Sequence, residues 1–424
     1  MKHKFLVSLL PQLVNAIIAL ATIRIYSGIL SSVQLGEIML ALGFMALMDA
    51  LFSSSINQSI FYFACKPNGL WNVLQIIIKS QSQWFWLPLI VLSVAGSSFV
   101  LYTGSLPVIL YWTILAMIAV AYIVVESIRS CYTALLNASQ FKVAFGIQIV
   151  IDAILVLLVT SATLTYKPEV YSLFIGILIA RLVSVVFVSS MVRHRYSHII
   201  EETNKSVPTQ KLLRRDVLIH ARPFIAMGAV GWASSFADRY AVAWTGGVAA
   251  AGIYAVATGL MGRPYNILSA SFTTHFRPTL FANVASGNAN AIRESHKRWL
   301  TYALGLGLLG TGLGWVLDQQ IVNLLLAVEH RSQVMPLIPI LGLAFTATIV
   351  THAFDNQILA RGQGNRLLSL QMVCVPITVL ALAGGSLLGG AIGAAWGRLV
   401  SELIRLVAVL VFSTVNNHGR DSKI

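Results

Sequence analysis

Charged side chains are scarce in this 424-residue sequence: they make up only 10% of it, against 57% hydrophobic side chains. A typical soluble domain carries about 25% charged and about 45–50% apolar residues. The shortage of charge excludes a water-soluble enzyme of ordinary composition, and the excess of apolar residues excludes a disordered chain. Of the charged residues, the acidic ones are the scarcer kind: there are 15 Asp and Glu against 29 Lys and Arg. A basic balance can indicate a nucleic-acid partner, but in so apolar a chain we expect it to reflect a membrane.

Cysteine is also rare, and the sequence contains neither a metal-ligand cluster nor a nucleophile–base arrangement. The three cysteines, Cys65, Cys131 and Cys374, lack metal-ligand spacing, so we interpret them as reduced structural thiols. A GxGxxG pattern at 305–310 lies in an apolar run without a preceding strand. It therefore predicts close helix packing rather than a dinucleotide site. We expect no metal, no cofactor and no enzymatic activity.

Long apolar runs fill most of the chain. A membrane helix needs about 20 mainly apolar residues, and the sequence supplies twelve such windows, which leave no room for a soluble catalytic domain. The first run is too long for a signal-peptide core, so we expect it to be retained. The windows are 5–27, 37–60, 84–102, 106–131, 143–164, 170–191, 222–244, 249–275, 299–317, 336–354, 367–387 and 390–414.

The basic residues are distributed unevenly between the loops. With both termini inside, the cytoplasmic segments hold 20 Lys and Arg, the outer loops hold only Lys167 and Arg331, and 7 lie within spans. This split follows the positive-inside rule. It supports an even number of spans and predicts that both termini are cytoplasmic, as is the polar linker from Arg193 to Arg222.

The two halves of the chain contain related segments. Five collinear matches share an offset near 217 residues, among them Arg-Leu-Val-Ser at 181–184 and at 398–401. Because each half holds an even number of spans, the two copies have the same orientation, related by a pseudo-two-fold axis along the membrane normal. We therefore expect two six-helix bundles, residues 1–205 and 206–424, around a central site. Other matched pairs are Arg24 with Arg239 and Gly36 with Gly252.

Three stretches carry a resemblance to a known family. FADRY at 236–240 and GIYAVA at 252–257 look like the seventh and eighth spans of polysaccharide exporters, and GGAIGAAWGRLVSE at 389–402 resembles their last span. The chain is similar to the O-antigen (Wzx-type) flippases of the multidrug/oligosaccharidyl-lipid/polysaccharide (MOP) flippase superfamily. Length and layout extend the resemblance over essentially the whole chain.

The resemblance implies a MATE-like, all-α polytopic fold in the bacterial cytoplasmic (inner) membrane. It implies transport of an undecaprenyl-diphosphate-linked oligosaccharide from the inner to the outer leaflet, by two V-shaped bundles that alternate their opening. Membrane lipids, a polysaccharide polymerase and a chain-length regulator are the implied partners, and no nucleic acid is expected.

Seven arginines lie within the predicted spans. A charge at mid-bilayer costs about 2.5–3.5 kcal/mol on insertion scales, so it usually faces a cavity or a partner. Arginine suits a diphosphate because its planar fork donates two parallel hydrogen bonds. Arg181 and Arg263 have no acidic residue within one helical turn and are the favoured cavity residues, whereas Arg24 could instead snorkel to the interface. The predicted substrate-binding set is Arg24, Arg181, Arg239, Arg263 and Arg398.

Acidic residues within spans are candidates for coupling to the proton gradient. Asp49 and Asp152 lie in spans without an adjacent cation. Each is therefore either a proton-binding carboxyl with a raised pKa or one arm of an inter-helix salt bridge. Glu126 and Glu402 lie near Arg129 and Arg398 on their own helices, which favours local ion pairs. The predicted proton-coupling set is Asp49, Asp152 and Glu126.

Two other functions are compatible with a polytopic membrane protein. A multidrug or cation antiporter of the same superfamily would need acidic walls, yet the only charged residue of the first span is Arg24. A membrane-embedded polysaccharide polymerase or ligase would need a large outer loop, yet the longest is roughly Leu317 to Met335. The sequence therefore favours a flippase coupled to the proton gradient.

Overall fold

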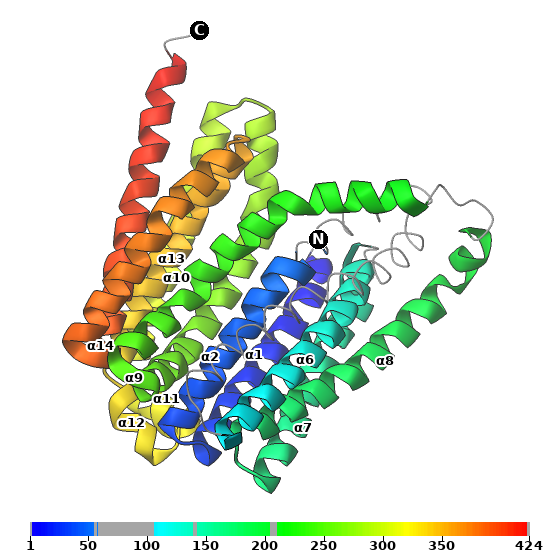
Figure 1. Ribbon diagram of the computed structural model, residues 1–424. Helices are drawn as coiled ribbons and strands as arrows, with labels where there is room; N and C mark the ends of the chain where they lie inside the picture. Colours follow the sequence, from blue (N-terminus) through cyan, green and yellow to red (C-terminus); the bar gives the residue numbers. More distant parts are fainter. Residues whose placement is uncertain (1, 55–56, 58–105, 139–141, 204–209, 422–424) are drawn as a thin grey trace. The chain divides into compact units, whose positions relative to one another are not determined.

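Helix is the regular secondary structure of the described chain. The computed structural model describes residues 2–54, 57, 106–138, 142–203 and 210–421. This confirms the all-α prediction for those residues. The helices are α1 (Lys2–Ile29), α2 (Ser32–Met48), the π-helix η1 (Asp49–Ser54), α6 (Leu106–Ala138), α7 (Lys142–Tyr166), α8 (Val170–Thr203), α9 (Gln210–Ala285), α10 (Ala289–Val316), α11 (Asp318–Leu325), α12 (Val328–Val334), α13 (Leu337–Ala360) and α14 (Gly364–Asp421) (Figure 1).

Eight of the described helices are long and apolar enough to cross a membrane. Two of them, α9 and α14, bend at glycines where the sequence predicts a turn between spans. Gly247 in α9 has φ 86°, and Gly390 in α14 has φ 55°, a left-handed conformation that glycine adopts without steric cost. Past the bend in α9, Tyr254 donates a hydrogen bond to Asp238, 16 residues earlier. The chain therefore doubles back at this point.

The predicted count of twelve spans remains a prediction. The window 84–102 and the end of the window 37–60 lie outside the described residues, and α1 supplies only a shorter apolar segment, Leu13–Ile29, to the described set. A multi-pass membrane protein follows from the described helices alone.

The chain divides into two compact units. The first unit comprises Met1–Ala19 and Ala41–Trp232, and the second comprises Leu20–Leu40 and Ala233–Ile424. The last third of α1 and the first half of α2 thus belong to the second unit, although they precede the predicted boundary at residue 205. That boundary between repeats stays a prediction.

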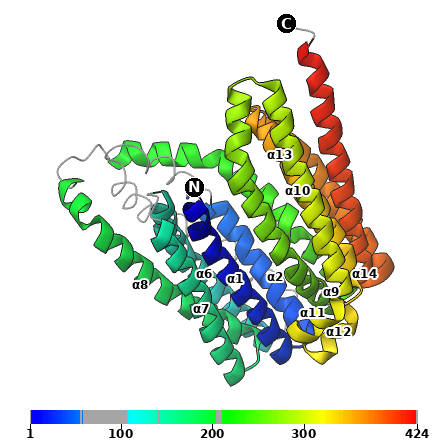
Figure 2. The same cartoon turned by 180° about the vertical axis from the view of Figure 1, so that it is seen from behind.

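In the first unit, α6, α7 and α8 pack against one another (Figures 1 and 2). The start of α1 lies against α7, where Pro11 fills the space beside Gly146. Trp232 of α9 donates its indole N–H to the carbonyl oxygen of Gly43 at 2.7 Å. Cys131 of α6 is buried and free, as predicted.

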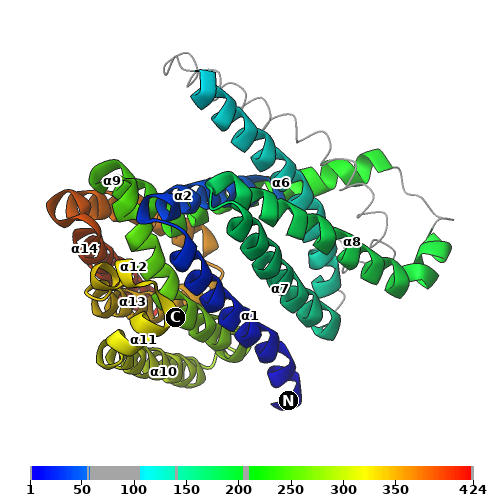
Figure 3. The ribbon, with the colours of Figure 1, turned by 90° about the horizontal axis from the view of Figure 1, so that it is seen from below.

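In the second unit, α13 packs against α10 and α14 (Figure 3). The Tyr265 hydroxyl of α9 lies 2.7 Å from the Thr311 hydroxyl of α10. A Cβ added to Gly307 would lie 2.7 Å from the methyl carbon of Thr346. Gly307 and Gly310 of the GxGxxG pattern therefore lie in helix α10 at close helix contacts, as the packing interpretation expects, whereas a Cβ added to Gly305 would have no neighbour within 4 Å among the described residues. Cys374 of α14 is also buried and free.

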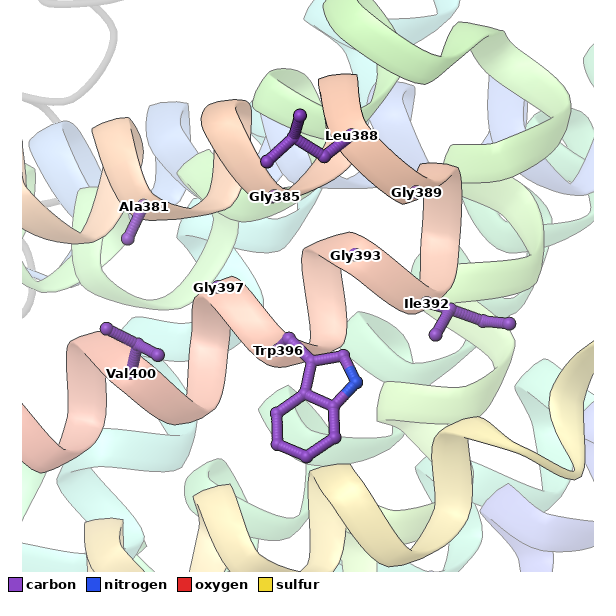
Figure 4. A pocket seen from close by; sticks show the side chains of 9 residues that line it. All are labelled: Ala381, Gly385, Leu388, Gly389, Ile392, Gly393, Trp396, Gly397 and Val400. Carbon is purple, nitrogen blue, oxygen red and sulfur yellow. The ribbon is translucent and has the colours of Figure 1, made fainter.

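The two arms of α14 also approach closely through small residues. A Cβ added to Gly393 would clash with the Gly385 carbonyl, and one added to Gly397 would clash with the Ala381 carbonyl. A shallow apolar pocket of about 490 Å³ lies along this hairpin. Figure 4 shows Leu388, Trp396 and the glycines along it. Small residues thus let the two arms of α14 pack closely.

Candidate functional site

The intramembrane arginines fall into two groups according to whether a carboxylate compensates their charge. Four of them, Arg129, Arg181, Arg398 and Arg405, form salt bridges with Asp or Glu. Within the described part of the chain, the other three, Arg24, Arg239 and Arg263, form none. This division is the main electrostatic feature of the protein, because a charge in the bilayer needs a partner, water or a ligand.

The first unit contains a balanced cluster on three helices. Arg129 donates to its helical neighbour Glu126 through Nε at 2.9 Å. Arg181 of α8 lies 3.2 Å from Glu126 through its own Nε and makes direct contact with Asp152 of α7. Asp152 also lies 3.6 Å from Arg129. Two guanidiniums and two carboxylates therefore neutralise one another, and none of these side chains is more than 18% exposed.

This cluster shows which of the local alternatives the structure adopts. The Glu126–Arg129 ion pair is present, and Asp152 is one arm of an inter-helix salt bridge. Arg181 has no acidic residue within one turn of its own helix, and both of its carboxylate partners belong to other helices. Its guanidinium therefore already forms salt bridges within the protein.

Asp49 lies beside this cluster without joining it. It begins the π-helix η1 and forms a side-chain hydrogen bond with Ser53. The charges of Glu126 and Arg129 act on it, but among described residues no arginine lies within salt-bridge distance. A third carboxylate thus adjoins a cluster that is already neutral. If ionised, it leaves a local charge of about −1, and a bound proton would remove that charge.

The second unit holds Arg398 in a comparable network. Its guanidinium lies 3.0 Å from Glu402 on the same helix and 3.3 Å from Asp238 on α9. The Tyr254 hydroxyl donates to the same Asp238 oxygen at 3.3 Å. Arg398 and Arg181 occupy the matched Arg-Leu-Val-Ser segments of the predicted repeat. Both are compensated, but their partners come from different spans in the two halves.

A further ion pair involves a carboxylate that the sequence interpretation missed. Arg405 of α14 donates to Asp355 of α13 at 2.8 Å. Asp355 lies one residue beyond the predicted window 336–354, so it was not counted among the intramembrane acids. The adjacent His352 lies 2.7 Å from the Ser269 hydroxyl of α9. Extending the window to the helix end at Ala360 would have included Asp355.

The three uncompensated arginines all belong to the second unit. Arg239 places its guanidinium over the Phe236 ring at 4.7 Å, and its buried Nε has no hydrogen-bond partner in the described structure. Arg263 lies close enough to Arg239 for their positive charges to repel. The side chains of Arg24 and Arg263 are exposed. Each therefore retains free donors.

The packing of α1 against α9 brings two of these arginines to neighbouring turns. A Cβ added to Gly259 of α9 would lie 3.6 Å from the Ile23 methyl carbon of α1. Arg24 follows Ile23 directly, and Arg263 lies one helical turn beyond Gly259. Together with Arg239, these residues concentrate positive charge and unused N–H donors on α1 and α9. Such a site suits an anion that accepts several hydrogen bonds.

Solved structures share this fold over nearly the whole chain. The lipid II flippase MurJ, in an inward closed conformation, matches with a TM-score of 0.74 at 13% identity, over 96% of this chain and 87% of that chain. An outward-facing multidrug resistance MATE family transporter of the MOP superfamily matches with a TM-score of 0.68 at 12% identity, over 99% of this chain and 96% of that chain.

A third structure is a MOP superfamily transporter from Pyrococcus furiosus, described by a reversed polarity of its binding pocket. It matches with a TM-score of 0.64 at 12% identity, over 97% of this chain and 95% of that chain. Neither a protein-family model nor a curated protein matches the sequence. The chain therefore has the fold found in MurJ and in MATE transporters of the MOP superfamily.

Proposed function

We propose that this protein is a flippase for a lipid-linked oligosaccharide with a diphosphate linkage, of the undecaprenyl-diphosphate type used for O-antigen and related surface polysaccharides. The observation that carries the proposal is the group of uncompensated arginines: Arg24, Arg239 and Arg263. The fold shared with MurJ, a lipid II flippase, supports a lipid-linked substrate. The resemblance to O-antigen flippases supports a polysaccharide repeat unit.

Diphosphate chemistry matches these residues. A guanidinium stays protonated at any physiological pH and donates two parallel hydrogen bonds to phosphate oxygens. A diphosphate diester carries about two negative charges and offers several acceptor oxygens, enough for more than one arginine. Arg181 and Arg398 were part of the predicted binding set. Both already form salt bridges with carboxylates. We therefore propose that they stabilise helix packing and that Arg24, Arg239 and Arg263 bind the substrate.

The charge distribution does not favour a multidrug or cation antiporter. A cationic drug needs available carboxylates, but Asp238 and Glu402 of the second unit are paired with Arg398. The surplus charge at the candidate site is positive. A polymerase or ligase is disfavoured because the outer segment between α10 and α13 contains only two short helices, Asp318–Leu325 and Val328–Val334.

The proposed setting is the bacterial cytoplasmic membrane, with both termini cytoplasmic. The distribution of basic residues between loops supports this orientation. Surrounding lipids and the lipid-linked oligosaccharide are the direct partners. A polysaccharide polymerase and a chain-length regulator would act on the oligosaccharide after it reaches the outer leaflet.

Reconstitution into vesicles tests the proposed function. The purified protein should move a fluorescent polyprenyl-diphosphate oligosaccharide between leaflets faster than protein-free vesicles do. A cationic dye typical of multidrug exporters should not be transported. Dye transport without lipid flipping would instead support the antiporter.

We further propose that Asp49 couples transport to the proton gradient. Asp49 adjoins the neutral Glu126–Arg129–Asp152–Arg181 cluster, so binding and release of one proton changes the local charge between about 0 and −1. In a bilayer that change is large enough to favour one conformation over another. Asp152 and Glu126 were also predicted to couple. Their salt bridges support a structural role for both.

Replacing Asp49 with Asn should abolish the response of transport to a pH gradient while the folded protein is retained. Asn imitates the protonated acid and cannot release a proton. The measurement is transport in vesicles with and without an imposed gradient. Asp152→Asn is the matched control, and it should lower the yield of folded protein because it removes a salt-bridge partner. Gradient-driven transport that is undiminished in Asp49→Asn would exclude the assignment.

A further inference from the structure

We propose that α12 is a latch on the outer side of the protein, which holds the turn between α1 and α2 on the second unit and must release it in each transport cycle. The residue at the centre of the latch is His330. The requirement for release rests on the proposed alternating-access transport, whereas the latch contact itself does not. In the proposed orientation, α1 ends and α2 begins at the outer surface, where α11 and α12 also lie.

Two hydrogen bonds join α12 to the end of α1, 300 residues apart in the sequence. The Nε2 atom of His330 lies 3.3 Å from the carbonyl oxygen of Leu30, and 3.1 Å from the carboxylate of its neighbour Glu329. The backbone N–H of Ala327 donates to the Ser27 hydroxyl at 3.3 Å. His330, Leu30 and Ser27 are each at most 2% exposed. His330 is thus a buried histidine outside the membrane spans that contacts the end of α1. It takes no part in the proposed substrate site.

The short helices α11 and α12 form a rigid platform for this contact. Arg331 donates to the carbonyl oxygens of Leu326 and Asn323, at 3.1 and 3.0 Å, and so fixes α12 to the end of α11. Val322 and Leu326 are fully buried beneath them. Helix α11 packs against α10, and α12 packs against α13, so the platform is anchored on other helices of the second unit.

Just after the turn between α1 and α2, the start of α2 packs against α9 at a contact between two glycines. A Cβ added to Gly252 of α9 would lie 2.8 Å from the Gly36 backbone nitrogen of α2, and one added to Gly36 would clash with the Val248 carbonyl. Gly36 and Gly252 are repeat counterparts that meet each other. Small residues at this contact let the backbones of α2 and α9 approach closely.

The division into units explains why this contact should move. The segment Leu20–Leu40 belongs to the second unit, while the rest of α1 and α2 belongs to the first. Covalent continuity therefore links this segment to the first unit, and only non-covalent contacts keep it on the second. The latch also reaches the candidate site, because the Ser27 hydroxyl donates to the carbonyl oxygen of Arg24 at 3.2 Å. Release of the turn would then displace the helical turn that carries Arg24.

Accessibility of Ser27→Cys to an impermeant thiol reagent tests the latch without any substrate. In a background with the native cysteines replaced, the introduced thiol should react slowly because α12 covers it. His330→Leu removes the hydrogen bond to Leu30 and should raise the labelling rate roughly fivefold. His330→Gln retains an N–H donor and should stay near the parent rate. Equal rates in all three proteins would overturn the latch.

Cross-linking tests the requirement for release. Ser27→Cys paired with Ala327→Cys should form a disulfide on oxidation and lose transport, and reduction should restore it. Each single-cysteine protein should transport normally under the same oxidant. Failure of the pair to cross-link, or undiminished transport in the cross-linked protein, would contradict the proposal. If the parent protein moves no lipid-linked oligosaccharide, the proposed function fails, and the labelling rates alone then decide the latch.

Discussion

Replacing Arg263 with Ala should lower transport of a diphosphate-linked oligosaccharide by about 10- to 100-fold while the protein still inserts and folds. A hydrogen bond to a charged group contributes about 1.5–3 kcal/mol, and each 1.4 kcal/mol corresponds to about tenfold in affinity. Arg263 is exposed on α9 and has no carboxylate partner among the described residues, so its removal leaves no buried charge behind. Vesicle transport and yield of folded protein are the two measurements.

The conservative and surface variants make this prediction specific. Arg263→Lys should recover only part of the activity, because a point charge replaces a two-pronged donor. Lys297→Ala removes one positive charge from an exposed position on α10 and should leave transport unchanged. Normal transport by Arg263→Ala would remove this residue from the site.

Replacing Arg181 with Ala should have the opposite signature, a loss of folded protein rather than a selective loss of transport. The change leaves Glu126 and Asp152 with only Arg129 to compensate them. Removing one partner of a buried ion pair destabilises a protein by about 3–5 kcal/mol. The measurement is the temperature at which half of the detergent-solubilised protein loses its monodisperse chromatographic peak, and this temperature should fall by several degrees.

A second change on the facing helix should repair the Arg181 variant. Combining Arg181→Met with Asp152→Asn leaves the Glu126–Arg129 pair balanced, and should restore most of the lost thermal stability. If Arg181→Ala is as stable as the parent protein yet inactive in transport, Arg181 belongs to the substrate site after all.

The helical architecture was predictable from local patterns. Apolar runs of about 20 residues specify membrane helices because the bilayer leaves no other way to satisfy backbone polar groups. Short gaps between the apolar runs located the bends: the bend in α9, at Gly247, lies between the predicted windows 222–244 and 249–275. The π-helix at Asp49 had no such signal, since its backbone depends on neighbouring helices. The membership of residues 20–40 in the second unit is likewise a tertiary property.

The division of the arginines into two groups could not be read from the sequence. Compensation on the same helix follows a spacing of three or four residues, as in Glu126 with Arg129 and Arg398 with Glu402. An ion pair between two helices has no characteristic spacing in the sequence. The partners of Arg181 therefore depend on how α6, α7 and α8 pack together. The candidates Arg24, Arg239 and Arg263 remain a prediction from charge and burial.

The most direct test of the central claim is competition for the candidate site during transport. Vesicles containing the protein are given a fluorescent polyprenyl-diphosphate oligosaccharide together with an excess of either unlabelled polyprenyl diphosphate or a quaternary ammonium drug. We predict that the diphosphate slows the fluorescent lipid, that the drug has no effect, and that Arg263→Ala weakens inhibition by the diphosphate. Inhibition by the cationic drug, with none by the diphosphate, would contradict the account.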